Sequence, residues 1–65
     1  MRIVTEWMSK RTAAEIEMTI FGFGYDWETE ERNGEIRFIV YAPKEDAAVV
    51  RNALLWRSIG VEEAA

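Results

Sequence analysis

The sequence predicts a small α+β domain: a three-stranded antiparallel β-meander with a long, bulged second strand and one C-terminal α-helix packed on one face. Two observations predict it. An Asn33-Gly34 pair separates two alternating segments, and a segment with helical periodicity follows Pro43. The 65 residues make a single domain, residues 1–65. A chain of this length buries only about 60% of its unfolded surface, so we expect a marginally stable monomer.

The first expected strand is Arg2–Met8, which is rich in β-branched and aromatic residues. Alternation gives one face with Ile3, Thr5 and Trp7, and another with Val4, Glu6 and Met8. Both faces carry apolar groups, so we expect this strand to be central or to be covered on both sides. The polar residues 9–12 are expected to form a connection.

The next segment, Ala13–Phe21, fits two structures, and the choice between them decides the topology. Its strict polar–apolar alternation favours a strand. A capping-box spacing at Thr12 and Glu15, with Gly22 as a stop, favours a short helix. Because so short a helix rich in Thr, Ile and Phe is weak, we expect a strand bent by a bulge at Gly22 or Gly24. The alternative order is β-α-β-β-α.

Asn33-Gly34 is expected to close a hairpin with a type I′ turn, whose two central residues need positive φ. A two-residue loop sets the register, which opposes Arg32 with Glu35, Glu30 with Arg37, and Trp27 with Val40. The expected core face consists of Tyr25, Trp27, Thr29, Ile36, Phe38 and Val40. The opposite, wetter face consists of Asp26, Glu28, Glu30, Arg37, Ile39 and Tyr41. A slip of one residue would mix the two sets, so the pattern supports the register.

A helix is expected over Lys44–Ile59, since Pro43 suits its first turn and Gly60 its end. One apolar arc of this helix consists of Ala47, Val49, Val50, Ala53, Leu54 and Trp56, and a second of Ala48, Leu55 and Ile59. A helix that covers one small sheet needs a single stripe, so the second arc predicts a homodimer. The expected interface residues are Leu55, Trp56, Ile59 and Trp7. Residues Val61–Ala65 are expected to be a frayed tail.

Composition narrows the classes of function. The chain has no Cys and no His, and its net charge is −4. The usual nucleophile–base pairs therefore cannot be assembled, and we expect no enzyme, no cofactor and no metal site. No apolar run approaches the roughly 20 residues of a membrane span, so we expect a cytoplasmic protein without membrane contact.

The hairpin concentrates negative charge at Asp26, Glu28, Glu30, Glu31 and Glu35. These carboxylates lack the Gly and the final Glu of a calcium loop. On a strand, alternate residues lie roughly 6.7 Å apart and would form a regular anionic row for a basic partner. The other interpretation is a solvated outer face, with a Glu30–Arg37 pair and charges that guard against edge aggregation.

These observations favour a small non-enzymatic protein–protein interaction module, a homodimer that presents the acidic hairpin to a basic partner surface. By analogy of size and charge with small phage-encoded inhibitors, we expect an inhibitor of a nucleic-acid-handling complex. One alternative is a dimeric nucleic-acid-binding module that uses Lys10, Arg11, Arg51 and Arg57, although the net negative charge argues against it. Another is a structural subunit of a larger assembly.

Overall fold

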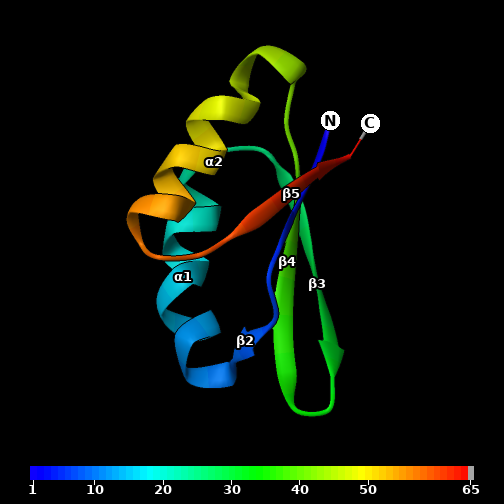
Figure 1. The fold of residues 1–65 in the computed structure, drawn as a ribbon, viewed down its shortest axis with the longest axis vertical. Coiled ribbons are helices and arrows are strands. Elements are labelled where there is room, and N and C mark those ends of the chain that lie inside the picture. The colour runs from blue at the N-terminus through cyan, green and yellow to red at the C-terminus, as the bar shows by residue number, and fades with distance from the viewer. Residues whose placement is uncertain (65) are drawn as a thin grey trace.

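The computed structural model describes residues 1–64 of the chain. In this part of the chain, an antiparallel sheet of five strands carries two helices on one face (Figure 1). The strands are β1 (Arg2–Thr5), β2 (Met8–Ser9), β3 (Asp26–Arg32), β4 (Glu35–Tyr41) and β5 (Val61–Ala64). The helices are α1 (Lys10–Gly22) and α2 (Ala47–Trp56), and a 3₁₀ turn, η1 (Lys44–Asp46), leads into α2. The α+β class is confirmed, but the expected meander with a single helix is wrong.

The strands follow one another across the sheet in the order β3-β4-β1-β5, and β2 continues β1 along the same edge of β4. Each helix therefore links two strands that have a third strand between them, α1 from β2 to β3 and α2 from β4 to β5. This is the β-α-β-β-α-β order of the split βαβ motif seen in ferredoxin-like folds. The expected alternative, β-α-β-β-α, comes close and lacks only the last strand. A topology of this kind is shared by many unrelated functions.

Residues 13–21 are helical, so the expected long bent strand is wrong. The N-cap of α1 is Ser9, whose Oγ accepts a hydrogen bond from the Thr12 backbone N–H at 3.1 Å. The helix buries Ala13, Ile16 and Ile20, which lie three and four residues apart. Met18, the remaining apolar residue of the alternating pattern, points outward and is exposed.

A β-bulge does occur, but in the first strand and not at Gly22 or Gly24. Val4 pairs with Ile39 and Met8 pairs with Ile36, so three residues of the first strand face two residues of β4. The extra residue reverses the alternation. Met8, not Trp7, therefore joins Ile3 on the buried, helix-covered face, and Trp7 lies on the uncovered face.

The hairpin is confirmed in turn and register. Its expected faces hold except at Thr29, which is exposed, and Ile39, which is buried. Asn33 and Gly34 have φ values of 53° and 79°, as a type I′ turn requires. All three expected cross-strand pairs are present. Phe38 and Val40 are fully buried beneath the helices, and Trp27 packs at the margin of the same core.

The C-terminal helix is shorter than expected, and a strand follows it. α2 ends in a Schellman turn with Ser58, not Gly60, in the left-handed conformation (φ 63°). In this turn the Ile59 N–H donates to the Leu54 carbonyl at 2.9 Å, and the Ser58 N–H to the Leu55 carbonyl at 2.8 Å. The chain then forms β5, which pairs antiparallel with β1. The expected frayed tail is therefore wrong for residues 61–64, and Ala65 lies outside the described residues.

The buried face of α2 is narrower than the arc expected from the helical wheel. Ala47, Val50 and Leu54 enter the core, whereas Val49 and Trp56 are exposed. Within residues 1–64, neither helix is long and apolar enough to span a bilayer.

Candidate functional site

The uncovered face of the sheet carries an aromatic–cationic cluster around Trp7. The guanidinium carbons of Arg32 and Arg37 lie 4.3 and 4.5 Å from the centroid of the Trp7 ring. Cations at this distance are attracted to the electron-rich face of the indole. The bulge produces this cluster, because without the extra residue Trp7 would point into the core. Sequence reasoning missed Arg32 entirely and gave Trp7 a role at a dimer interface.

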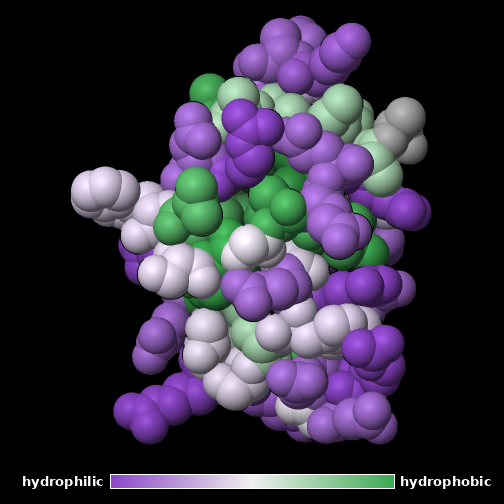
Figure 2. Space-filling model, in the orientation of Figure 1, coloured by the Kyte–Doolittle hydropathy of each residue, from purple (hydrophilic) through white to green (hydrophobic). Residues whose placement is uncertain are grey.

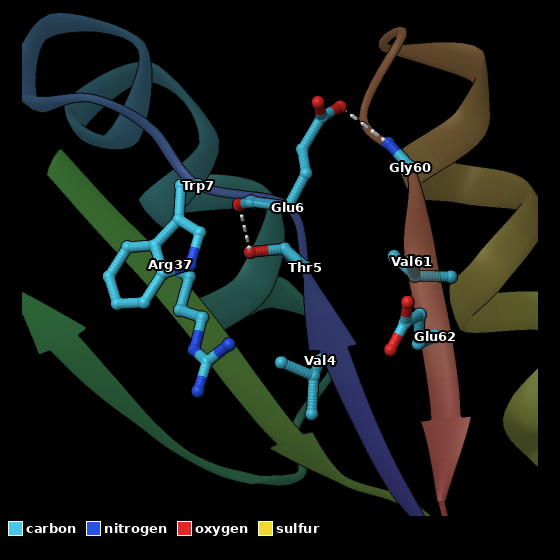
Figure 3. A pocket seen from close by; sticks show the side chains of 8 residues that line it. All are labelled: Val4, Thr5, Glu6, Trp7, Arg37, Gly60, Val61 and Glu62. Atoms are coloured by element: carbon cyan, nitrogen blue, oxygen red, sulfur yellow. Dashed lines mark hydrogen bonds between the residues drawn. The ribbon is translucent and has the colours of Figure 1, made fainter.

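A cleft of about 430 Å³ lies next to this cluster (Figure 3). Its lining residues are Val4, Thr5, Glu6, Trp7, Arg37, Gly60, Val61 and Glu62. Figure 3 shows Arg37 and Glu62 reaching from different strands on either side of Val4. The Glu6 carboxylate holds the chain after α2 against the first strand, since its Oε1 accepts a hydrogen bond from the Gly60 N–H at 2.7 Å.

The side-chain hydroxyl of the cleft is taken up by the backbone. This hydroxyl, that of Thr5, donates to the Glu6 carbonyl at 3.0 Å and accepts from the Phe38 N–H at 2.9 Å. Both of its hydrogen-bonding roles therefore serve the backbone. Elsewhere in residues 1–64, no group of three or more acidic, His or Cys side chains is placed to hold a metal ion.

Only some of the hairpin carboxylates form the anionic row expected from the sequence. Glu30 forms an ion pair with Arg37, whose Nε donates to Glu30 Oε1 at 2.6 Å. Glu28 accepts a hydrogen bond from the Tyr41 hydroxyl at 2.6 Å, and this bond raises the pKa of Tyr41. Asp26 is exposed on the same face and has no ion pair within the described residues.

The other two hairpin acids lie apart from that row. Glu31 points to the helix-covered side, where it pairs with Lys10 of α1 at 3.4 Å. Glu35 is exposed beside the turn, opposite Arg32. We therefore define the acidic row as Asp26, Glu28 and Glu30 alone.

The outer side of the helices carries a second kind of surface. We define the helix-layer patch as the exposed large apolar side chains Met18, Phe21, Val49, Leu55 and Trp56. Figure 2 shows hydrophobic surface in the middle of the view, where α2 and β5 lie side by side, with hydrophilic surface above it and to the right. Trp56 is 90% exposed. Val49 and Trp56 are seven residues apart, which is two turns, so they lie on one face of α2.

The structure divides the four interface residues expected from the sequence. Leu55 and Trp56 lie in the helix-layer patch, whereas Trp7 lies on the opposite side of the sheet. Ile59 is only 6% exposed and belongs to the core cluster, because the Schellman turn folds the chain back beneath α2. Met18 and Phe21 were missed, since their three-residue spacing is a signal only in a helix.

The two faces of the molecule differ in how far their apolar side chains are buried. On the uncovered sheet face, Ile39 is only 5% exposed, although no second layer covers it. Its cross-strand partners Val4 and Glu28 lie on either side of it in the sheet. The five side chains of the helix-layer patch are each 62–90% exposed. Large apolar side chains that stay exposed on one layer of a small protein are typical of an interaction site.

No protein-family model, no characterised protein and no solved structure matches this chain.

Proposed function

We propose that the chain is a small non-enzymatic protein–protein interaction module that forms a homodimer through the helix-layer patch. The observation that carries the proposal is the nearly complete exposure of Trp56 among other large apolar side chains. Tryptophan is enriched among the residues that dominate interface energies. An indole exposed to this extent offers on the order of 200 Å². That is about a quarter of the roughly 800 Å² that each partner buries in a standard interface.

Charge supports a second copy as the occupant of the patch. Next to Met18, α1 exposes Glu15 and Glu17, while its basic residues Lys10 and Arg11 lie in its first turn. The charged residue of α2 is Arg51, which also pairs with Glu63 of its own chain, and Arg57 follows just beyond the helix. A two-fold dimer makes every cross-contact twice. If α1 of one protomer packs against α2 of the other, acidic and basic side chains meet at both ends of the interface.

Light scattering after size-exclusion chromatography tests the dimer. We expect wild type to elute with twice its chain mass of 7.6 kDa, and Trp56→Glu with the mass of one chain. Trp7→Glu is the matched control, because it is the same substitution on the uncovered sheet face, where the new carboxylate lies beside Arg32 and Arg37. It should remain a dimer. A single-chain mass for wild type, or a dimeric Trp56→Glu, would overturn the proposal.

The acidic row supports a second binding surface, one for a partner protein that carries positive charge. Asp26 and Glu28 have no cationic partner within residues 1–64, and they lie along the exposed edge of the sheet. Such a row favours a basic protein and disfavours nucleic acid. That the basic protein belongs to a nucleic-acid-handling complex stays a prediction from size and charge.

A further inference from the structure

The outer edge of β3 has no backbone partner among the described residues. β3 is seven residues long, and its only neighbour in the sheet is β4. In a hairpin with a two-residue turn, Arg32 and Glu35 form a hydrogen-bonded pair, and every second pair along the ladder does the same. The N–H and C=O groups of Trp27, Thr29 and Glu31 therefore point away from β4, toward an incoming strand.

A groove of about 330 Å³ runs beside this edge, between β3 and α1. It exists because α1 packs over β4 and leaves the inner face of β3 open, so that Thr29 is exposed. The apolar part of its lining consists of Ala13, Ala14, Ile36 and Phe38. Lys10, Glu17 and Glu31 also line it, and the Lys10–Glu31 ion pair links helix and strand across it.

We propose that β3 and this groove bind an extended basic segment of another protein, which adds to the sheet as a further strand. In such β-strand addition, backbone hydrogen bonds supply affinity, and pockets for alternate side chains supply specificity. Side chains of the added strand that face the helices enter the groove between α1 and β3. Those on the other side lie against the acidic row.

The charges on β3 favour a basic segment over a second copy of β3. Antiparallel self-pairing centred on Thr29 opposes Glu28 with Glu30 of the other copy, twice, and like charges directly opposite one another destabilise a sheet. The Asp26–Arg32 contacts at the two ends do not remove that central repulsion. Lysine or arginine at alternate positions of the added strand turns the same row into an attraction.

No residue that lines the groove belongs to the helix-layer patch, but Glu17 lies in the groove and also beside Met18 of the patch, so the peptide is titrated into both the dimeric and the monomeric chain. The probe is a capped, fluorescently labelled peptide that alternates lysine and valine over the seven residues that β3 offers. We expect saturable binding by fluorescence anisotropy, with an affinity that falls as salt is added. Absence of saturable binding at low salt would overturn the proposal.

Two comparisons separate strand addition from simple charge attraction. A peptide that alternates lysine and proline has the same charge, but its prolines lack the N–H groups that the groove-facing valines would donate to β3 in an antiparallel pair, so it should not bind. Ala14→Phe fills the groove and should weaken binding of the valine peptide by roughly tenfold, about 1.4 kcal/mol. Equal binding of both peptides would contradict strand addition, and so would unchanged binding by a folded Ala14→Phe.

Ala48→Phe is the matched control for the groove, since Ala48 is an exposed alanine of α2 and the substitution is identical. It should bind the peptide as wild type does. The same titrations in the Trp56→Glu chain separate the two proposals, because a monomeric chain that still binds the peptide shows that strand addition does not depend on the dimer.

Discussion

At the scale of single residues, the hydroxyl of Thr5 replaces a backbone carbonyl as the hydrogen-bond acceptor of a strand N–H. The bulge removes the usual strand partner of the Phe38 N–H, and Thr5 Oγ1 accepts this hydrogen bond in its stead, at 2.9 Å. Thr5 is the one buried polar residue among the described residues. It stabilises the bulge, and the bulge places Trp7 beside Arg32 and Arg37 on the uncovered face.

Thr5→Val tests this role, because it keeps the shape of the side chain and removes the acceptor. We expect the free energy of unfolding to fall by about 1–3 kcal/mol, the cost of leaving a buried N–H without a partner. Urea unfolding followed by circular dichroism measures it. Thr5→Ser is the control, since it keeps the hydroxyl and loses one methyl group, worth about 0.8 kcal/mol. If valine proved as stable as threonine, the hydroxyl would have no structural role.

At the scale of elements, local signals decide how much the sequence can predict. The turn and register of the hairpin were predicted because Asn33-Gly34 sets both within a few residues. α1 was not, because Ile16 and Ile20 are four residues apart and satisfy both an alternating strand and a helical stripe. The contact of that stripe with the sheet decides between them, and this contact is not visible in the local sequence.

The other misses have the same origin. The bulge depends on Thr5 meeting Phe38, which is 33 residues away along the chain. β5 is short and carries two glutamates, so its pattern resembles a polar tail, and only its pairing with β1 makes it a strand. Of the candidate site, the sequence predicted Asp26, Glu28, Glu30, Leu55 and Trp56 as surface groups. It could not predict the groove, which arises between a misassigned helix and β3.

Two tyrosines connect elements through hydrogen bonds from their hydroxyls to carboxylates. The Tyr25 hydroxyl donates to Asp46 of η1, and that of Tyr41 donates to Glu28 of β3. These hydrogen bonds, followed by partial burial and nearby carboxylates, raise the pKa of both tyrosines above the usual 10.0. A folded pKa above the unfolded one means that the stabilisation is complete below pH 10 and is lost as the pH rises through the folded pKa.

We therefore expect the urea midpoint to hold up to about pH 10 and to fall beyond it. Absorbance of tyrosinate should give a midpoint above 10.0 in the native protein, since the chain has only these two tyrosines. Tyr25→Phe and Tyr41→Phe should each reduce the alkaline loss of stability. A native midpoint at or below 10.0 would contradict both hydrogen bonds.

At the scale of the whole molecule, both ends of the described chain meet in one sheet. β1 is central because β4 pairs with one of its edges and β5 with the other. β5 also reaches α2, where Glu63 pairs with Arg51 at 3.2 Å, and Val61 packs against the core cluster. The last strand therefore connects the sheet to the helix layer that carries the proposed dimer surface.

A chain that ends at Gly60 tests how much of the fold depends on this strand. Its removal takes away a four-residue ladder and the partly buried Val61, and it leaves β1 at the edge. The hydrogen bonds and apolar contact together are worth on the order of 3 kcal/mol. A domain of this length has a total stability of roughly 3–10 kcal/mol, so we expect the truncated chain to lose much or all of its cooperative unfolding transition.

The Arg51–Glu63 ion pair contributes little to this loss, because both side chains are partly exposed and such pairs are worth about 0–1 kcal/mol. Glu63→Gln should therefore unfold close to wild type. A chain that ends at Ala64 keeps every described strand and should also unfold as wild type does. Thermal unfolding followed by circular dichroism compares the three. If the chain ending at Gly60 unfolded at the wild-type temperature, residues 61–64 would be a tail and β1 the true edge of the sheet.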